Sequence, residues 1–238
     1  MVILQKIKKI SRFVGYPYLD TYPVFLNSMP KAGTNLMENF LVLLGYKRNL
    51  ARCLNESNIS SVKLHPSQGR FYIGHIVDDD LIHSSGFLTI YLKRDLWSCL
   101  KSYVNYMSID HAHPVSQQLR MSPTLETVRS LFFTSNNPNG RPLVEEYLRF
   151  YSLDLERYQL SVEFSDLVAH DPKLVARIAQ LFELKECVVK ECMIKACKSE
   201  SYTKNIGRIN MFGDFDELGI KNLEQQVIDA ELRVTSNC

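Results

Sequence analysis

The stretch at residues 22–45 limits the possible folds of this chain more than any other. It begins with an apolar, β-prone run at residues 24–26 and continues into a short loop that contains Pro30, Lys31 and Gly33. Apolar residues then recur at helical spacing as far as a glycine that favours a helix end. The sequence therefore predicts a strand, a tight loop and a helix.

The predicted loop has the properties of an anion-binding site. The first amides of the helix and the positive end of its dipole point toward the loop. Gly33 permits close approach of the backbone to a ligand, Lys31 adds a positive charge, and the Thr34 hydroxyl adds a donor. Because the lysine precedes the glycine, this is not the G-x-x-x-x-G-K-[ST] loop of nucleoside triphosphatases.

Composition narrows the class of protein. A chain of 238 residues that is 45% hydrophobic favours a single domain over residues 1–238. A net charge of +2 is too small for a dedicated nucleic-acid binder. The 6 cysteines form no C-x-x-C pair and favour reduced thiols, and no apolar run is long enough to span a membrane. We expect a cytoplasmic enzyme with no nucleic-acid partner.

The N-terminal segment, residues 1–16, is basic and amphipathic. Its apolar residues alternate with lysines and an arginine, which is typical of a surface helix. We expect this helix to pack on the domain. Weak contact of residues 1–14 with a membrane surface is the alternative.

Further apolar runs predict strands at residues 71–76, 87–92 and 160–164, with helices between them. Alternating strands and helices predict an α/β fold of three layers, with a central parallel sheet flanked by helices. In such folds ligands collect at the C-terminal ends of the strands. Lys31, His75 and Arg94 are expected at that edge.

The remaining segments receive simpler predictions. A polar loop at residues 50–69 is expected to border the ligand, and an irregular segment at residues 108–122 is expected to form a lid over the acceptor. Helical patterns occur at residues 125–133, 143–153, 172–182 and 223–234.

Two motifs resemble those of sulfotransferases that use 3'-phosphoadenosine 5'-phosphosulfate (PAPS). Residues 30–36, Pro-Lys-Ala-Gly-Thr-Asn-Leu, resemble the P-K-[SA]-G-T-x-[LW] loop of that family. Residues 90–103 resemble its second signature, a strand that ends in Arg-Asp and a helix with a serine eight positions after the arginine. Arg94 and Ser102 keep this spacing. An arginine fork suits the 3'-phosphate that distinguishes PAPS from most nucleotides.

Two later segments resemble the same family more loosely. Residues 160–172 resemble its strand-and-turn motif, with Phe164 in place of a common tyrosine. Residues 202–215 are similar to its closing glycine-rich loop, which also binds the 3'-phosphate. Lys204, Gly207 and Arg208 are the candidates in that loop.

The resemblance covers residues 22–215. It implies the P-loop-containing nucleotide-hydrolase-like (sulfotransferase) fold, PAPS as co-substrate, adenosine 3',5'-bisphosphate (PAP) as product, and no metal. The acceptor is left open as a hydroxyl or amine of a small molecule or carbohydrate. The nucleotide-binding residues that the resemblance implies are Lys31, Ala32, Gly33, Thr34, Asn35, Leu36, Arg94, Ser102, Lys204, Gly207 and Arg208.

His75 and Lys31 are the candidate catalytic residues. Lys31 is expected to neutralise charge on the leaving oxygen, and His75, at a predicted strand end, suits the general base that the family requires. The alternative bases are His65, Asp78, His111 and His113.

Two other functions stay open at this point. One is a small-molecule kinase or nucleotide hydrolase of the same fold, which the displaced lysine disfavours. The other is a nucleotide-binding protein without catalysis.

Overall fold

A computed structural model describes residues 22–50, 53–109, 114–134, 140–199 and 210–236 of the chain. The described part of the chain divides into two compact units. Among the described residues, the first unit contains those up to Ser28, those in Ala32–Lys93 and those in Asp154–Ser199. The second unit contains Met29–Lys31, the described residues in Arg94–Leu153 and residues 210–236. The expected basic helix at residues 1–16 lies outside the described residues, and the prediction of one domain stays a prediction.

The first unit is built on a parallel sheet. Its strand order is β2-β4-β1-β5-β6, and β3 pairs with the end of β4. Strand β1 is central and pairs with β4 on one side and with β5 on the other. The strands are β1 (Val24–Ser28), β2 (Lys47–Arg48), β3 (Leu54–Asn55), β4 (Arg70–His75), β5 (Leu88–Lys93) and β6 (Leu160–Glu163).

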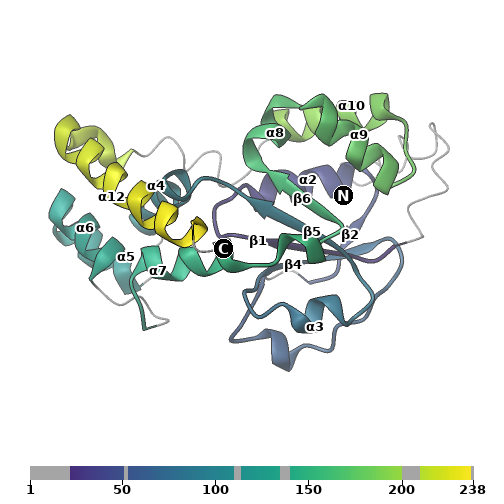
Figure 1. Cartoon of the computed structure of the whole chain (residues 1–238), viewed down its shortest axis with the longest axis horizontal. Helices are drawn as coiled ribbons and strands as arrows, with labels where there is room; N and C mark the ends of the chain where they lie inside the picture. Colours follow the sequence, from purple (N-terminus) through teal and green to yellow (C-terminus); the bar gives the residue numbers. More distant parts are fainter. Residues whose placement is uncertain (1–21, 51–52, 110–113, 135–139, 200–209, 237–238) are drawn as a thin grey trace. The chain divides into compact units, whose positions relative to one another are not determined.

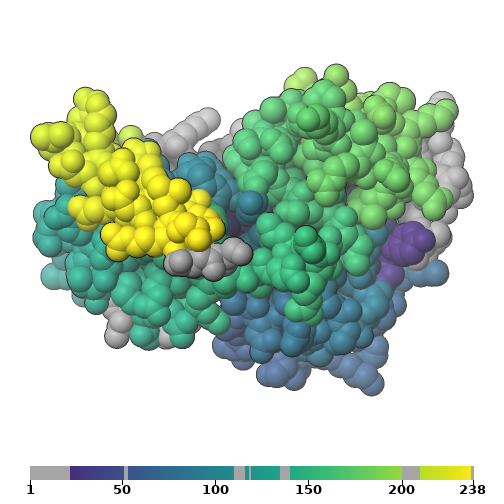
Figure 2. All heavy atoms as spheres, in the orientation of Figure 1, coloured from purple at the N-terminus to yellow at the C-terminus, as the bar shows by residue number. Residues whose placement is uncertain are grey.

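Helices cover both faces of this sheet. One face carries α2 (Thr34–Leu43), α8 (Phe164–Ala169), α9 (Pro172–Leu181) and α10 (Glu186–Lys198), and the other carries α3 (Asp80–His83), as Figure 1 shows. In Figure 2 the green surface of α8–α10 and the blue surface around α3 lie on opposite sides of the unit. The predicted α/β class with a parallel sheet between helical layers is confirmed.

The core on the α3 face forms around Phe25. Its ring stacks on Tyr72 with centroids 6.3 Å apart and meets Phe87 edge-on at 5.8 Å. Gly74 leaves the space for this ring, because a Cβ there would lie 2.8 Å from a carbon of Phe25. This glycine therefore lets an aromatic ring pack directly against the neighbouring strand.

The second unit is helical in its described part. Trp97 packs edge-on against Phe132 and Phe212, with centroids 6.3 and 5.7 Å apart. The short 3-10 helix Leu155–Arg157 belongs instead to the first unit. The helices of the second unit are α4 (Leu96–Met107), α5 (Pro114–Met121), α6 (Leu125–Phe133), α7 (Leu143–Leu148) with the 3-10 turn Arg149–Ser152, the 3-10 turn Met211–Asp214 and α12 (Glu217–Thr235).

Several boundaries differ from the prediction. The segment at residues 108–122, expected to be irregular, contains α5, because Pro114 suits the first position of a helix and Leu119 is buried. The loop at residues 50–69 contains β3 and the 3-10 turn Ile59–Ser61. Helix α12 begins earlier than expected because the Asp216 carboxylate accepts the Gly219 amide. Across the described ranges no helix has the length and apolar character to cross a membrane.

Helix α9 begins at a carboxylate cap that can be tested. The Asp171 carboxylate accepts the amides of Lys173 and Leu174 at 2.9 and 3.0 Å. We expect Asp171→Ala to lower the free energy of unfolding by about 1 kcal/mol in urea titrations. Asp171→Ser is the control and should retain most of the stability, because serine is also a good cap. An equal loss in both variants would contradict the capping role.

Candidate functional site

The loop between β1 and α2 has an unusual backbone. Gly33, the residue before α2, has φ 103°, and Lys31 has φ 63° although it carries a side chain. A left-handed conformation in a residue other than glycine costs on the order of 1–3 kcal/mol and tends to occur at functional sites. Lys31 is therefore the strained residue of this loop, and Gly33 adopts a left-handed conformation without that cost.

The first turn of α2 carries the remaining loop candidates. Ala32 is buried, and Thr34, Asn35 and Leu36 are half-buried. The Leu36 amide already bonds to the carbonyl of Gly33 at 2.9 Å. The earlier amides of a helix have no carbonyl of that helix to bind, so this end of α2 suits an anion.

The Phe164 ring packs against Gly33. A Cβ at Gly33 would lie 2.3 Å from Cδ2 of Phe164 and 2.5 Å from Cε2. The ring at the end of β6 therefore lies on the loop backbone itself. Sequence reasoning noted Phe164 as a departure from the sulfotransferase motif but did not predict this contact, which joins positions far apart in the chain.

His75 contacts the end of β1. Its Nδ1 lies 2.8 Å from the Ser28 carbonyl oxygen, which can only accept. The imidazole therefore carries its proton on Nδ1 when neutral, and Nε2 is the nitrogen with a lone pair. The Ser28 hydroxyl lies 3.2 Å from the same Nδ1 and 2.9 Å from the Thr34 hydroxyl.

The structure thus brings together His75, Ser28 and Thr34. Register explains this, since β1 and β4 run parallel with Asn27 opposite Gly74, so the two strands end side by side. Ser28 was missed as a site residue. The sequence feature that could have indicated Ser28 is its position as the last residue of a buried strand, directly before the loop.

Lys31 is described within the second unit. Its ammonium lies 3.5 Å from the ring centroid of Tyr106 on α4. This is a close cation–π contact, a type of interaction that contributes about 0.5–2 kcal/mol depending on solvent exposure. Tyr106 was not predicted as part of the site.

Arg94 and Ser102 are also in the second unit. Arg94 directly follows β5, and its carbonyl accepts the Tyr151 hydroxyl at 3.0 Å. Its Nε lies 3.9 Å from the Asp95 carboxylate, which caps α4 through the Ser98 amide. Ser102 is half-buried on α4, roughly 10 Å along the helix from the cap. A ligand bound by both would need the arginine to extend along the helix.

The alternative bases have different surroundings. Asp78 is exposed. His65 lies in the segment before β4, where its amide bonds to the Tyr72 hydroxyl at 3.3 Å. His111, His113, Lys204, Gly207 and Arg208 lie outside the described residues. Of the candidate bases that are described, His75 is the one bonded to the end of β1.

A cleft of about 880 Å³ opens beside α3 in the first unit. It includes Asp78 and part of the polar segment that was expected to border a ligand. Its walls are formed by Glu56, Ile59, Ser60, Asp78, Asp80, Leu81, His83, Ser84 and Arg157. Among the residues that the structure describes, no group of three or more His, Cys, Asp or Glu side chains is arranged to hold a metal ion.

The Gly33–Phe164 contact predicts the effect of added volume. Gly33→Ala should lower the free energy of unfolding by about 2–4 kcal/mol, because it combines left-handed strain with a clash. Gly86→Ala is the matched control, since Gly86 has φ 73° but open space around its Cβ position, and it should cost only the strain. Phe164→Leu should recover part of the Gly33→Ala loss in a double-mutant cycle. Additive losses would contradict the clash.

The chain matches no model of a known protein family, and a search of curated proteins also finds no similar sequence.

Proposed function

We propose that the chain is a PAPS-dependent sulfotransferase with the P-loop-like fold of that class. The observation that carries the proposal is the His75 imidazole held at the end of β1, with its hydrogen-bonding partner Ser28 bonded in turn to Thr34 of the P-K-A-G-T-N-L loop. A base and an anion-binding loop at one strand end are what sulfuryl transfer to a hydroxyl requires.

Sheet topology supports this placement. From β1 the chain passes to β2, β3 and β4 on one side and then crosses to β5 on the other. In open α/β sheets, ligands bind outside the C-terminal ends of the strands where the order reverses in this way. The loop after β1 is therefore the position at which a nucleotide is expected.

The reaction follows from these groups. The acceptor oxygen attacks the sulfur of PAPS, and the bond from sulfur to the bridging oxygen of the 5'-phosphate breaks. Nε2 of His75 takes the acceptor proton, and PAP leaves with the bridging electron pair. Lys31 and the amides of the loop stabilise the negative charge that develops on the leaving oxygen.

Arg94 and Ser102 are assigned to the 3'-phosphate of PAPS, and Lys204, Gly207 and Arg208 are proposed to complete that site. The acceptor is a hydroxyl or amine of a small molecule or carbohydrate, and the compartment is the cytoplasm. The kinase alternative shares the fold class but needs Mg²⁺ for its phosphates. Nucleotide preference in the presence of a metal chelator separates the two.

The first test of the proposal is nucleotide binding. By calorimetry with a chelator present, PAP should bind more tightly than adenosine 5'-monophosphate, and Arg94→Ala should weaken PAP binding by about 10- to 150-fold. Arg70→Ala is the control, because Arg70 is an exposed arginine at the opposite end of β4. Equal affinity of the wild-type protein for the two nucleotides would refute the 3'-phosphate assignment.

The second test concerns the base. With labelled PAPS and a panel of hydroxyl and amine acceptors, His75→Asn should lower turnover by about 10²- to 10⁴-fold with PAP affinity retained. Wild-type turnover should also fall at acid pH, because a protonated imidazole cannot accept a proton. Asp78→Asn should stay near wild type. The reverse result, an active His75→Asn and an inactive Asp78→Asn, would make Asp78 the base.

A further inference from the structure

Asn27 joins the ends of β1 and β4 through its side chain. It is fully buried, and its Oδ1 accepts the Ile76 amide at 2.9 Å while its Nδ2 donates to the Ile76 carbonyl at 2.8 Å. Backbone pairing between the strands reaches Asn27 and Gly74. The side-chain amide therefore continues the pairing beyond the last backbone register.

This pair of bonds flanks the candidate base. Asn27 directly precedes Ser28, and Ile76 directly follows His75. Because one side chain fixes both neighbours, it also fixes the spacing between the Ser28 carbonyl and the imidazole that donates to it. Loss of these bonds would let the end of β4 shift, and the imidazole with its Nε2 would shift with it.

Tyr158 reinforces the orientation of the Asn27 amide. Its hydroxyl donates to the Asp79 carboxylate at 2.6 Å and accepts from Nδ2 of Asn27 at 2.8 Å. Burial and the bond to Asp79 raise the pKa of the Tyr158 phenol, so it keeps its proton. The Tyr158 hydroxyl and the Ile76 carbonyl thus both accept from Nδ2, and Oδ1 faces the Ile76 amide.

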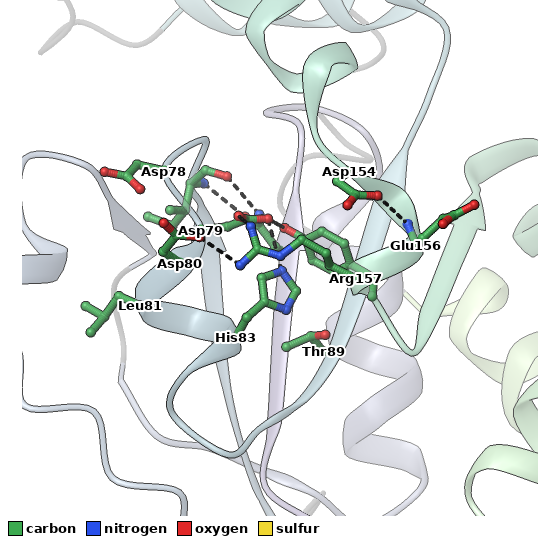
Figure 3. Close-up of polar contacts among 12 residues, drawn as sticks. Asp78, Asp79, Asp80, Leu81, His83, Thr89, Asp154, Glu156 and Arg157 are labelled. Atoms are coloured by element: carbon green, nitrogen blue, oxygen red, sulfur yellow. Dashed lines mark hydrogen bonds and ion pairs between the residues drawn. The ribbon is translucent and has the colours of Figure 1, made fainter. Parts of the chain in front are cut away.

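Asp79 is the buried end of this series. Only 5% of it is exposed, and its second oxygen accepts from Arg157 at 3.2 Å. Nε2 of His83 lies 3.1 Å from the oxygen that Tyr158 uses. Figure 3 shows the Arg157 and His83 side chains directed toward Asp79. The carboxylate is therefore held in place from several sides.

Stability alone does not require a buried polar network of this kind. Burying polar groups costs free energy that their hydrogen bonds must offset, and an apolar replacement of matched shape is often neutral or stabilising. What polar groups provide is direction, since each bond fixes the orientation of the next group. This series of hydrogen bonds ends at Ile76, the residue that follows His75.

We propose that Asp79, Tyr158 and Asn27 are positioning residues that hold His75 in the Nδ1–H form with Nε2 directed for proton transfer. The catalytic part of this inference rests on the proposed function. The orientation of His75 is independent of the proposed function and can be measured without substrate.

The test is Tyr158→Phe, which removes the hydroxyl and keeps the ring that packs against Tyr91 and His83. Tyr72→Phe is the matched control, because Tyr72 is a buried tyrosine whose hydroxyl bonds elsewhere. In ¹⁵N spectra of the full-length, histidine-labelled protein at alkaline pH, with His75 assigned by His75→Asn, wild type and Tyr72→Phe should show one tautomer, protonated at Nδ1. Tyr158→Phe should show a mixture of tautomers.

Kinetics give the second measurement. Tyr158→Phe should lower kcat by about 10- to 100-fold with PAP affinity within about twofold, since misplacement of a base affects the chemical step. If Tyr158→Phe does not fold, Asp79→Asn replaces it, with the same expected tautomer mixture.

The outcomes separate the two proposals. If wild type transfers sulfate and Tyr158→Phe matches Tyr72→Phe in both tautomer and kcat, the positioning inference is overturned and the proposed function stands. If Tyr158→Phe shows the tautomer mixture but the wild-type protein transfers no sulfate, the positioning of His75 stands and the proposed function fails.

Discussion

Burial of strand β1 is the constraint on which the first unit depends, because this strand pairs on both sides and every one of its residues is enclosed. A polar residue inside such a strand must find its partners within the protein. Asn27 and Ser28 find them at the end of β4. The Asn27 bonds fix Ile76, the residue after His75, and the His75 imidazole itself bonds to the Ser28 carbonyl, so stability and the candidate chemistry depend on the same end of these two strands.

The sequence allowed the parallel sheet to be predicted because its main strands are continuous apolar runs that end at turn residues. The expected strand at residues 71–76 is β4 with a shift of one residue, and a parallel arrangement then places His75 at the edge where β1 ends. Helix α5 was missed because its segment mixes polar residues with little periodicity. Strands β2 and β3 have two residues each, which is too short to carry a pattern.

The contacts that complete the candidate site could not be predicted from the sequence, because they join residues far apart in the chain. Asn27 and Tyr158 are separated by 131 positions, and Gly33 and Phe164 are similarly distant. Periodicity reports which face a residue takes and says nothing about which distant side chain meets it. A weak signal existed at Asn27, because an amide between apolar residues of a buried strand implies a hydrogen-bonding partner elsewhere.

The Tyr106 ring beneath the Lys31 ammonium has a consequence for selectivity among anions. An anion that draws the ammonium away from the aromatic face loses this contact, at a cost of about 0.5–2 kcal/mol. That cost lowers the apparent affinity by roughly 2- to 30-fold. A doubly charged ligand recovers it through stronger attraction, whereas a singly charged one recovers less. Where the ring contact is lost, that cost therefore favours doubly charged anions over singly charged ones at this lysine.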